Sequence, residues 1–205
     1  MLKEFQASGI VLTGGKSLRM GCNKASLTIE NKSLLERVIS SIDALCNEII
    51  IVSSPLNNLQ KPSCNLKVRI VNDIYPDKGP LAGIHAGLSA SNSERSLVVA
   101  CDMPFLQQDL LRYMISISAE YDAVIPRIGD FTEPLHAIYD KNCLAVIDEL
   151  LNRGIRKISE LFSLVKVRYL DEQEIHQYDP EGVSFFNINT KKELELFIAS
   201  NGYYK

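Results

Sequence analysis

A glycine-rich segment that carries three cations follows the first apolar run of the chain. Residues 12–24 read LTGGKSLRMGCNK, and the cations are Lys16, Arg19 and Lys24. Adjacent glycines let the backbone come close to a ligand and direct N–H groups at phosphate oxygens. The segment matches neither a Walker A loop nor the dinucleotide fingerprint GxGxxG, because neither spacing is present. It therefore predicts a triphosphate-binding loop of another class, with a solvated basic loop as the alternative.

A carboxylate ends a second apolar run, in the segment VVACDMPF of residues 98–105. An acid at the carboxyl end of a strand, across from a cationic loop, is well placed to bind Mg²⁺ that bridges nucleotide phosphates. Asp102 is therefore the candidate metal ligand. The alternative is that Asp102 only caps the helix that follows.

Two weaker signals complete the set of candidate site residues. Asp73 follows a third apolar run and could accept hydrogen bonds from a ribose or a base, although Asp is also a common turn former. In the segment FNINT of residues 186–190, Asn187 and Asn189 project to the same side if the chain is extended there. A turn or a helix cap is the alternative for this pair.

Apolar segments of strand length alternate with segments of helical periodicity along the chain. The predicted strands cover residues 8–13, 48–53, 66–71, 96–100, 122–126, 135–139, 164–170 and 183–186. The predicted helices cover residues 33–45, 81–91, 106–119, 142–151, 155–162 and 191–200, and residues 172–181 are predicted to form a loop. Ser33 and Glu36 match a capping box at the first helix.

This alternation predicts one α/β domain over residues 1–205, with a mainly parallel sheet covered by helices on both faces. In open sheets of this kind, ligands bind beyond the carboxyl ends of the strands, near the point where the strand order reverses. We therefore expect the chemistry in the turns after the first, third and fourth predicted strands. These turns hold the glycine-rich segment, Asp73 and Asp102.

Composition narrows the class of protein. The 205 residues include 22 Lys and Arg against 25 Asp and Glu, a formal charge of −3, which argues against a nucleic-acid binder. The five cysteines form no CxxC pair, so reduced thiols are expected rather than disulfides or a zinc site. No apolar run is long enough for a signal peptide or a membrane span, and a cytoplasmic protein is expected. The three histidines accompany no Ser or Cys nucleophile at a recognisable spacing, which makes a hydrolytic triad improbable.

The motifs, taken in order, resemble those of the molybdenum cofactor guanylyltransferase (MobA-type) family. They are LxGGxxxRMGxxK, ND, GPLAG, CDMPF, EPLHAIY and NxNT, and they run along nearly the whole chain. The resemblance implies a three-layer, Rossmann-like nucleotidyltransferase fold of the GT-A-like type. It also implies transfer of GMP from GTP to the terminal phosphate of molybdenum-loaded molybdopterin, with release of pyrophosphate and with Mg²⁺ as the cofactor.

The resemblance also implies roles for individual residues. Arg19, Lys24 and an Asp102-bound Mg²⁺ would neutralise charge during transfer, and no general base is needed because a phosphate nucleophile is already ionised. Proteins that deliver and accept the cofactor are the implied partners. The residues implied to contact GTP are Leu12, Thr13, Gly14, Lys24, Asp73 and Asp102, and those on the molybdopterin side are Glu133, Asn187 and Asn189.

Four departures from the family pattern leave two alternatives open. Asn23 stands where relatives usually have Asp, Thr13 replaces Ala, Lys191 replaces Pro, and Ser53-Ser54 occupies the place of an Asn beside the base. One alternative is a CTP-dependent molybdopterin cytidylyltransferase, and the other is a non-catalytic GTP-binding regulator. Guanine is favoured because Gly14 replaces an Ala of the cytidylyl relatives, which leaves room for a purine.

Overall fold

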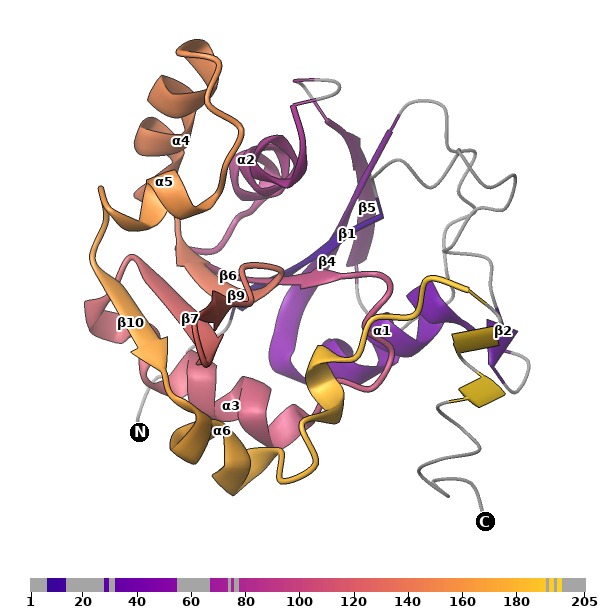
Figure 1. Ribbon diagram of the computed structural model, residues 1–205. Helices are drawn as coiled ribbons and strands as arrows, with labels where there is room; N and C mark the ends of the chain where they lie inside the picture. The colour runs from indigo at the N-terminus through magenta and orange to yellow at the C-terminus, as the bar shows by residue number, and fades with distance from the viewer. Residues whose placement is uncertain are drawn as a thin grey trace.

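The computed structural model describes residues 7–13, 28–29, 32–54, 67–73, 75, 78–190, 192–193 and 195–196. Its centre is a mixed sheet with the strand order β10-β7-β9-β6-β1-β4-β5, and β8 pairs with β7 (Figure 1). The strands are β1 (Ala7–Leu12), β4 (Cys46–Ser53), β5 (Lys67–Asn72), β6 (Arg95–Ala100), β7 (Ala123–Ile128), β8 (Phe131–Thr132), β9 (His136–Asp140) and β10 (Val167–Leu170). A separate two-stranded hairpin joins β2 (Thr28–Ile29) to β3 (Lys32–Ser33).

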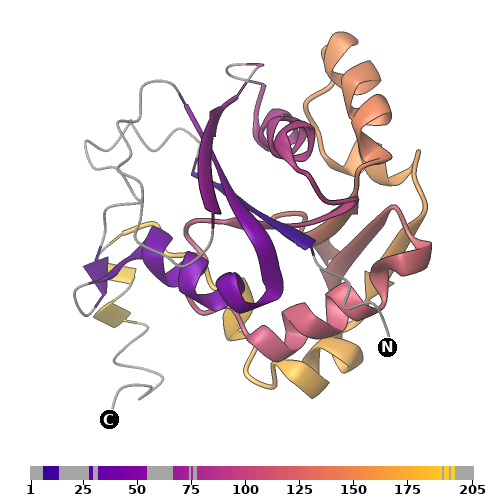
Figure 2. The same ribbon diagram turned by 180° about the vertical axis from the view of Figure 1, so that it is seen from behind.

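Helices cover both faces of this sheet, as the two views show (Figures 1 and 2). One face carries α1 (Leu34–Ile42), α3 (Gln108–Ser116) and α6 (Glu172–Tyr178), and the other carries α2 (Pro80–Ala90), α4 (Cys143–Asn152) and α5 (Ser159–Phe162). Short 3₁₀ turns are η3 (Asp43–Leu45), η4 (Ser118–Glu120) and η5 (Val183–Phe185). The predicted α/β class and three-layer arrangement are confirmed. None of the helices in the described part of the chain has the length and apolar character needed to cross a membrane.

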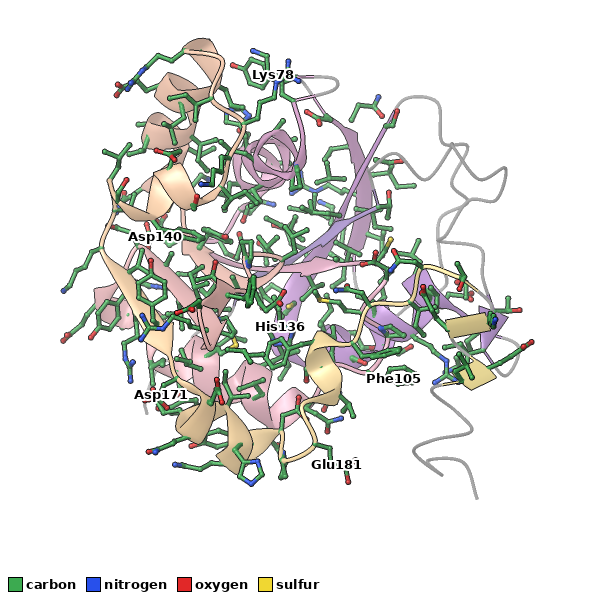
Figure 3. All side chains as sticks on the ribbon, viewed as in Figure 1. Lys78, Phe105, His136, Asp140, Asp171 and Glu181 are labelled. Carbon is green, nitrogen blue, oxygen red and sulfur yellow. The ribbon has the colours of Figure 1, made fainter. Side chains whose placement is uncertain are left out.

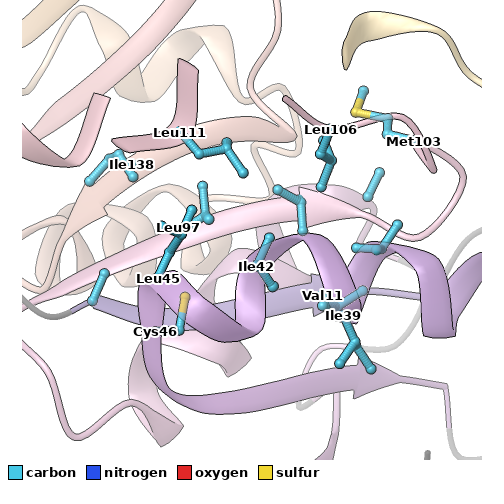
Figure 4. Close-up of a cluster of buried hydrophobic side chains, with 14 of the residues drawn as sticks. Val11, Ile39, Ile42, Leu45, Cys46, Leu97, Met103, Leu106, Leu111 and Ile138 are labelled. Atoms are coloured by element: carbon cyan, nitrogen blue, oxygen red, sulfur yellow. The ribbon is translucent and has the colours of Figure 1, made fainter. Parts of the chain in front are cut away.

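The core strands of the sheet are apolar on both faces, because helices cover both of them. In β1, Ala7 and Val11 point into the core under α1 and α3, while Ile10 and Leu12 point into the core under α2. Figure 4 shows the first of these cores, in which Val11 packs with side chains from α1 and β6. Of the strands in the main path, β9 alone runs antiparallel to its neighbours.

The first helix begins where its capping box was predicted. The Glu36 N–H donates to Ser33 Oγ at 3.2 Å, and the Ser33 N–H donates to Glu36 Oε2 at 2.8 Å. These reciprocal bonds satisfy two backbone donors that a helix terminus leaves without intrahelical partners. The Ser33 N–H and hydroxyl both donate to Glu36 Oε2, and these hydrogen bonds lower the Glu36 pKa.

Two of the predicted elements near the C-terminus are wrong. Residues 172–181, predicted to be a loop, contain α6, which begins with a capping box of Asp171 and Glu174. Residues 183–186, predicted to be a strand, contain the 3₁₀ turn η5. The chain forms a turn there because the Asp179 carboxylate accepts hydrogen bonds from the N–H groups of Val183 and Ser184, at 3.1 and 2.9 Å.

Close packing of α2 on β1 makes Gly87 intolerant of a side chain. A Cβ at Gly87 would lie 2.4 Å from Cγ2 of Ile10, well inside contact distance. We expect Gly87→Ala to lower the free energy of unfolding by about 1–3 kcal/mol, because overpacking outweighs the better helix propensity of Ala. Denaturant unfolding followed by circular dichroism measures this change.

Gly83 provides the matched control on the same helix face. Its Cβ would meet the nearest side-chain atom, Leu12 Cδ2, at 3.4 Å, which is ordinary contact. Gly83→Ala should therefore leave stability unchanged or raise it slightly, through the helix propensity of Ala. Equal unfolding free energies for the two variants would contradict the packing argument.

Candidate active site at the carboxyl edge of the sheet

The strand order reverses between β1 and β6. In the sheet, β4 and then β5 lie on one side of β1. The next strand along the chain, β6, pairs with the other side of β1. Leu12 is in register with Ala100, and the Cys101 N–H donates to the Leu12 carbonyl at 3.1 Å. The segments that leave β1 and β6 therefore begin side by side, at the position where sheets of this type bind ligands.

Thr13 is buried at the end of β1 and faces β4. Its N–H donates to the Val52 carbonyl at 2.9 Å, and its hydroxyl donates to the same oxygen at 3.0 Å. The Thr13 hydroxyl therefore helps to fix the backbone where the glycine-rich segment begins. Gly14, Arg19 and Lys24 lie outside the described residues, so their predicted roles stay predictions.

Asp102 does not cap the next helix. Helix α3 begins at Gln108 with Gln107 as its N-cap, and the Gln107 N–H donates to Ser184 Oγ at 2.9 Å. Asp102 lies before this cap, in a turn closed by the Met103 N–H on the Ala100 carbonyl, and is partly exposed. The capping alternative is therefore wrong, and the position at the end of β6 is the one predicted for a metal ligand.

The asparagine segment lies directly against Asp102. The Ile188 N–H donates to the Asp102 carbonyl at 2.8 Å, and the Ile188 side chain is fully buried with Ile29 and Leu34. Asn187 and Asn189, on either side of Ile188, are both exposed, as expected for an extended segment. The structure thus brings the two asparagines and Asp102 together, although they are far apart in the sequence.

Asp73 lies at the same edge of the sheet, directly after β5. Its N–H donates to the Ser53 carbonyl at 3.2 Å, and its Oδ1 accepts the Tyr75 N–H at 2.8 Å. The turn-forming role that sequence alone suggested for Asp73 is therefore present. A contact between Asp73 and the nucleotide stays a prediction, and β1 and β4 separate Asp73 from Asp102 in the sheet.

Glu133 lies on the other side of Asp102, just before β9. Its N–H donates to the Pro126 carbonyl at 2.9 Å, and the carbonyl of the nearby Leu135 accepts from Ala100 at 3.0 Å. Burial raises the pKa of the Glu133 carboxyl group. The four positions Asp73, Thr13, Asp102 and Glu133 thus follow one edge of the sheet, in the order β5, β1, β6, β9.

A cationic segment at the same end of the molecule was not among the predicted site residues. Residues 153–157 read RGIRK after α4, and Arg153, Arg156 and Lys157 are all exposed. Lys78, which follows β5, donates from Nζ to the Leu151 carbonyl at 3.0 Å and so joins the end of α4 to that edge (Figure 3). The sequence signal was a run of cations around Gly154, which has a positive φ of 76°.

The chemistry of the donor set favours a metal held jointly with a substrate. Within the described ranges, no three His, Cys, Asp or Glu side chains are grouped closely enough to form a metal site. Mg²⁺ is commonly bound by one or two carboxylates together with substrate phosphates. A single carboxylate such as Asp102, at an edge suited to a nucleotide, fits that arrangement.

Known proteins are similar to this chain in sequence and in fold. Residues 9–169 match the model of the MobA-like NTP transferase domain. The chain belongs to this family. The match extends from β1 to β10, and membership of the MobA-like NTP transferase family makes the chain a nucleotidyltransferase.

Three relatives of this family member cover almost its whole length. A probable molybdenum cofactor guanylyltransferase of Pelotomaculum thermopropionicum is 38% identical, over 93% of this chain and 91% of that protein. A molybdenum cofactor guanylyltransferase of Desulfosudis oleivorans is 36% identical, over 92% of each chain. The crystal structure of molybdopterin-guanine dinucleotide biosynthesis protein A from Archaeoglobus fulgidus has a TM-score of 0.77 and 30% identity, covering 92% of this chain and 95% of that one.

Proposed function

We propose that this protein transfers GMP from GTP to the terminal phosphate of molybdenum-loaded molybdopterin and releases pyrophosphate. The observation that carries the proposal is the pairing of the β1 and β6 ends, which sets Asp102 beside the start of the glycine-rich segment. A phosphate oxygen of molybdopterin attacks the α-phosphorus of GTP, and the bond to the bridging α,β-oxygen breaks. The names of the relatives in Pelotomaculum and Desulfosudis support this substrate pair.

The reaction requires alignment and charge neutralisation rather than proton transfer. Both reactants are anions, and the attacking phosphate is ionised at neutral pH. In the proposal, the backbone from Leu12 to Gly14 holds the nucleotide, while Arg19 and Lys24 contact its phosphates. Asp102 would hold Mg²⁺, which when bound neutralises charge on the phosphates.

The acceptor is proposed to bind on the β9 side of Asp102. Asn187 and Asn189 offer amide donors and acceptors next to the Asp102 backbone. Glu133 would repel a phosphate when ionised, so its carboxyl group suits the N–H donors of the pterin ring. We place the reaction in the cytoplasm, with the proteins that deliver and accept the cofactor as transient partners.

The proposed base is guanine, which presents N1–H and an exocyclic amine and therefore requires acceptors. Backbone carbonyls near Leu12 and the Asp73 carboxylate would supply them. The Leu12 carbonyl already accepts from Cys101, but a carbonyl oxygen has a second lone pair. A base without these donors would leave buried acceptors unpaired, which disfavours its binding strongly.

Turnover with three nucleotides tests this proposal. We expect GTP to support pyrophosphate release from molybdenum-loaded molybdopterin with a kcat/KM on the order of 10³ times those of CTP and ATP. Purified protein, Mg²⁺ and a coupled pyrophosphate assay give the three values. A preference for CTP would indicate the cytidylyltransferase alternative, and GTP binding without pyrophosphate release would indicate a regulator.

A further inference from the structure

A polar cluster outside the proposed reaction centre joins the segment after β5 to helices α2 and α4. Nε2 of His85 in α2 lies 2.8 Å from Oδ1 of Asp148 in α4. The Tyr75 hydroxyl donates to the same Asp148 oxygen at 3.4 Å, and the Tyr75 and His85 rings meet edge to face with centroids 5.3 Å apart. We call Tyr75, His85 and Asp148 the α2–α4 clasp.

The clasp places a polar ring in an otherwise apolar helix. The side chain of His85 is only 8% exposed, and its neighbours along α2 belong to the buried core. Burial of an imidazole without a partner is unfavourable, because the ring loses its hydrogen bonds to water. Nδ1 of His85 is buried without a hydrogen-bond partner in the described part of the chain, so the ring proton belongs on Nε2, which faces Asp148.

The clasp is connected to Asp73 through Tyr75. The Tyr75 N–H donates to Asp73 Oδ1 at 2.8 Å, while Asp73 itself is tied to β4 through the Ser53 carbonyl. Lys78 adds a second contact with α4, because its Nζ donates to the Leu151 carbonyl and lies 4.9 Å from the centre of the Tyr75 ring. The position of the Asp73 carboxylate therefore depends on contacts that α4 makes with Tyr75 and Lys78.

We propose that Tyr75, held by His85 and Asp148, is a positioning residue that aims the Asp73 carboxylate at the nucleotide. This inference rests on the proposed function, in which Asp73 binds a purine nucleoside triphosphate. A carboxylate that is already oriented loses less conformational freedom when it accepts a hydrogen bond from a ligand. The clasp thus contributes to GTP affinity although none of its three members needs to touch the nucleotide.

Removal of the Asp148 carboxylate tests the clasp. We expect Asp148→Ala to weaken the binding of GTP in the presence of Mg²⁺ by about tenfold, measured by calorimetric titration of the full chain. Asp148→Asn retains an oxygen acceptor for His85 and Tyr75 and should restore most of the affinity. Tyr75→Phe removes only the 3.4 Å hydrogen bond and should have a smaller effect. The matched control is Glu149→Ala, since Glu149 is the exposed next residue of α4 and pairs only with Arg153 among the described residues.

A double-mutant cycle separates positioning from general loosening of the fold. If Asp148 acts through Asp73, then Asp148→Ala should not weaken GTP binding further in a chain that already carries Asp73→Ala. An equal loss in both backgrounds would overturn the proposal, and so would unchanged GTP affinity in Asp148→Ala. The thermal midpoints of all variants, compared with that of Glu149→Ala, show whether any loss follows unfolding instead.

Measurement of both GTP binding and pyrophosphate release distinguishes this inference from the proposed function. A wild-type protein that binds GTP but releases no pyrophosphate would refute the proposed transfer and leave the clasp supported by its own variants. A wild-type protein that transfers GMP, with Asp148→Ala binding GTP as tightly, would refute the clasp alone. Absence of GTP binding by the wild-type protein would overturn both.

Discussion

Asp102→Asn should reduce GMP transfer by on the order of 10³-fold while the protein stays folded, because loss of the metal ligand removes several kcal/mol of transition-state stabilisation. Asn retains the shape of Asp but not the charge that holds Mg²⁺ between protein and phosphates. The fold should tolerate the change for two reasons. Asp102 does not cap α3, and its contact with Ile188 uses the backbone carbonyl, which the substitution keeps. Asp102→Ala should behave in the same way.

Pyrophosphate release at saturating GTP, measured across a range of Mg²⁺ concentrations, checks this prediction. Asp109→Asn is the matched control, because Asp109 is an exposed carboxylate in the first turn of α3 and lies nearby in the sequence. Circular dichroism of all variants shows whether the fold is kept. Turnover of Asp102→Asn within a few-fold of the control would show that the metal, if required, is held by other residues.

Strands buried on both faces were the easiest elements to predict from the sequence. The apolar runs that became β1, β4 and β6 are found within two residues of their predicted bounds, since parallel strands under two helix layers need side chains that are apolar throughout. The direction of β9 could not be predicted in the same way. The apolar residues of 135–139 suit a parallel or an antiparallel central strand, and only the structure shows that β9 is antiparallel to β6.

Both errors near the C-terminus lie in segments where carboxylates accept hydrogen bonds from nearby backbone N–H groups. Helix α6 is short and mostly exposed, so its helical periodicity is weak, although Asp171 and Glu174 carry a capping-box signal that the prediction did not use. The turn η5 depends on hydrogen bonds to Asp179, which compete with the strand that the apolar residues of 183–186 suggested. In such segments, local side-chain hydrogen bonds decide the conformation.

The candidate site could likewise be predicted only in part from the sequence. Its place at the carboxyl edge followed from the strand pattern, because the chemistry-bearing residues come directly after strands. That Asp102 does not cap α3 could be seen only from the observed start of α3 at Gln108. The pairing of His85 with Asp148 joins two helices far apart in the sequence, and no local pattern indicates it.

Because His136 is buried, we expect the free energy of unfolding to decrease as the pH falls below 6.5. The ring is completely buried at the start of β9 against Phe185, with centroids 4.8 Å apart. A Ser184 backbone group favours the protonated ring, but the effect of burial outweighs it. Desolvation lowers its pKa from 6.5 to about 4. Between these two values the unfolded chain binds a proton that the folded protein does not, so the stability present above pH 6.5 is lost as the pH falls toward 4.

Unfolding by urea at pH 7.5 and pH 5 measures this loss. At pH 5 the shift corresponds to about 2 kcal/mol, and His136→Leu, which cannot titrate, should lose less stability than the wild type by about that amount. His176→Leu is the control for the same replacement at an exposed position, because His176 lies exposed on α6.

The choice of pH 5 separates His136 from the carboxyl groups. Glu36 and Glu48 have pKa values lowered from 4.5, so the stability that they contribute is lost mainly below that value. The pKa of Glu133 is raised, so this carboxyl group is protonated at a higher pH in the folded protein than in the unfolded chain. Its protonation therefore increases the free energy of unfolding as the pH falls. All three proteins contain Glu133, so its contribution cancels in the comparison. If His136→Leu lost as much stability as the wild type between pH 7.5 and 5, then His136 would not be the buried base responsible. The acid sensitivity would then have to come from another group.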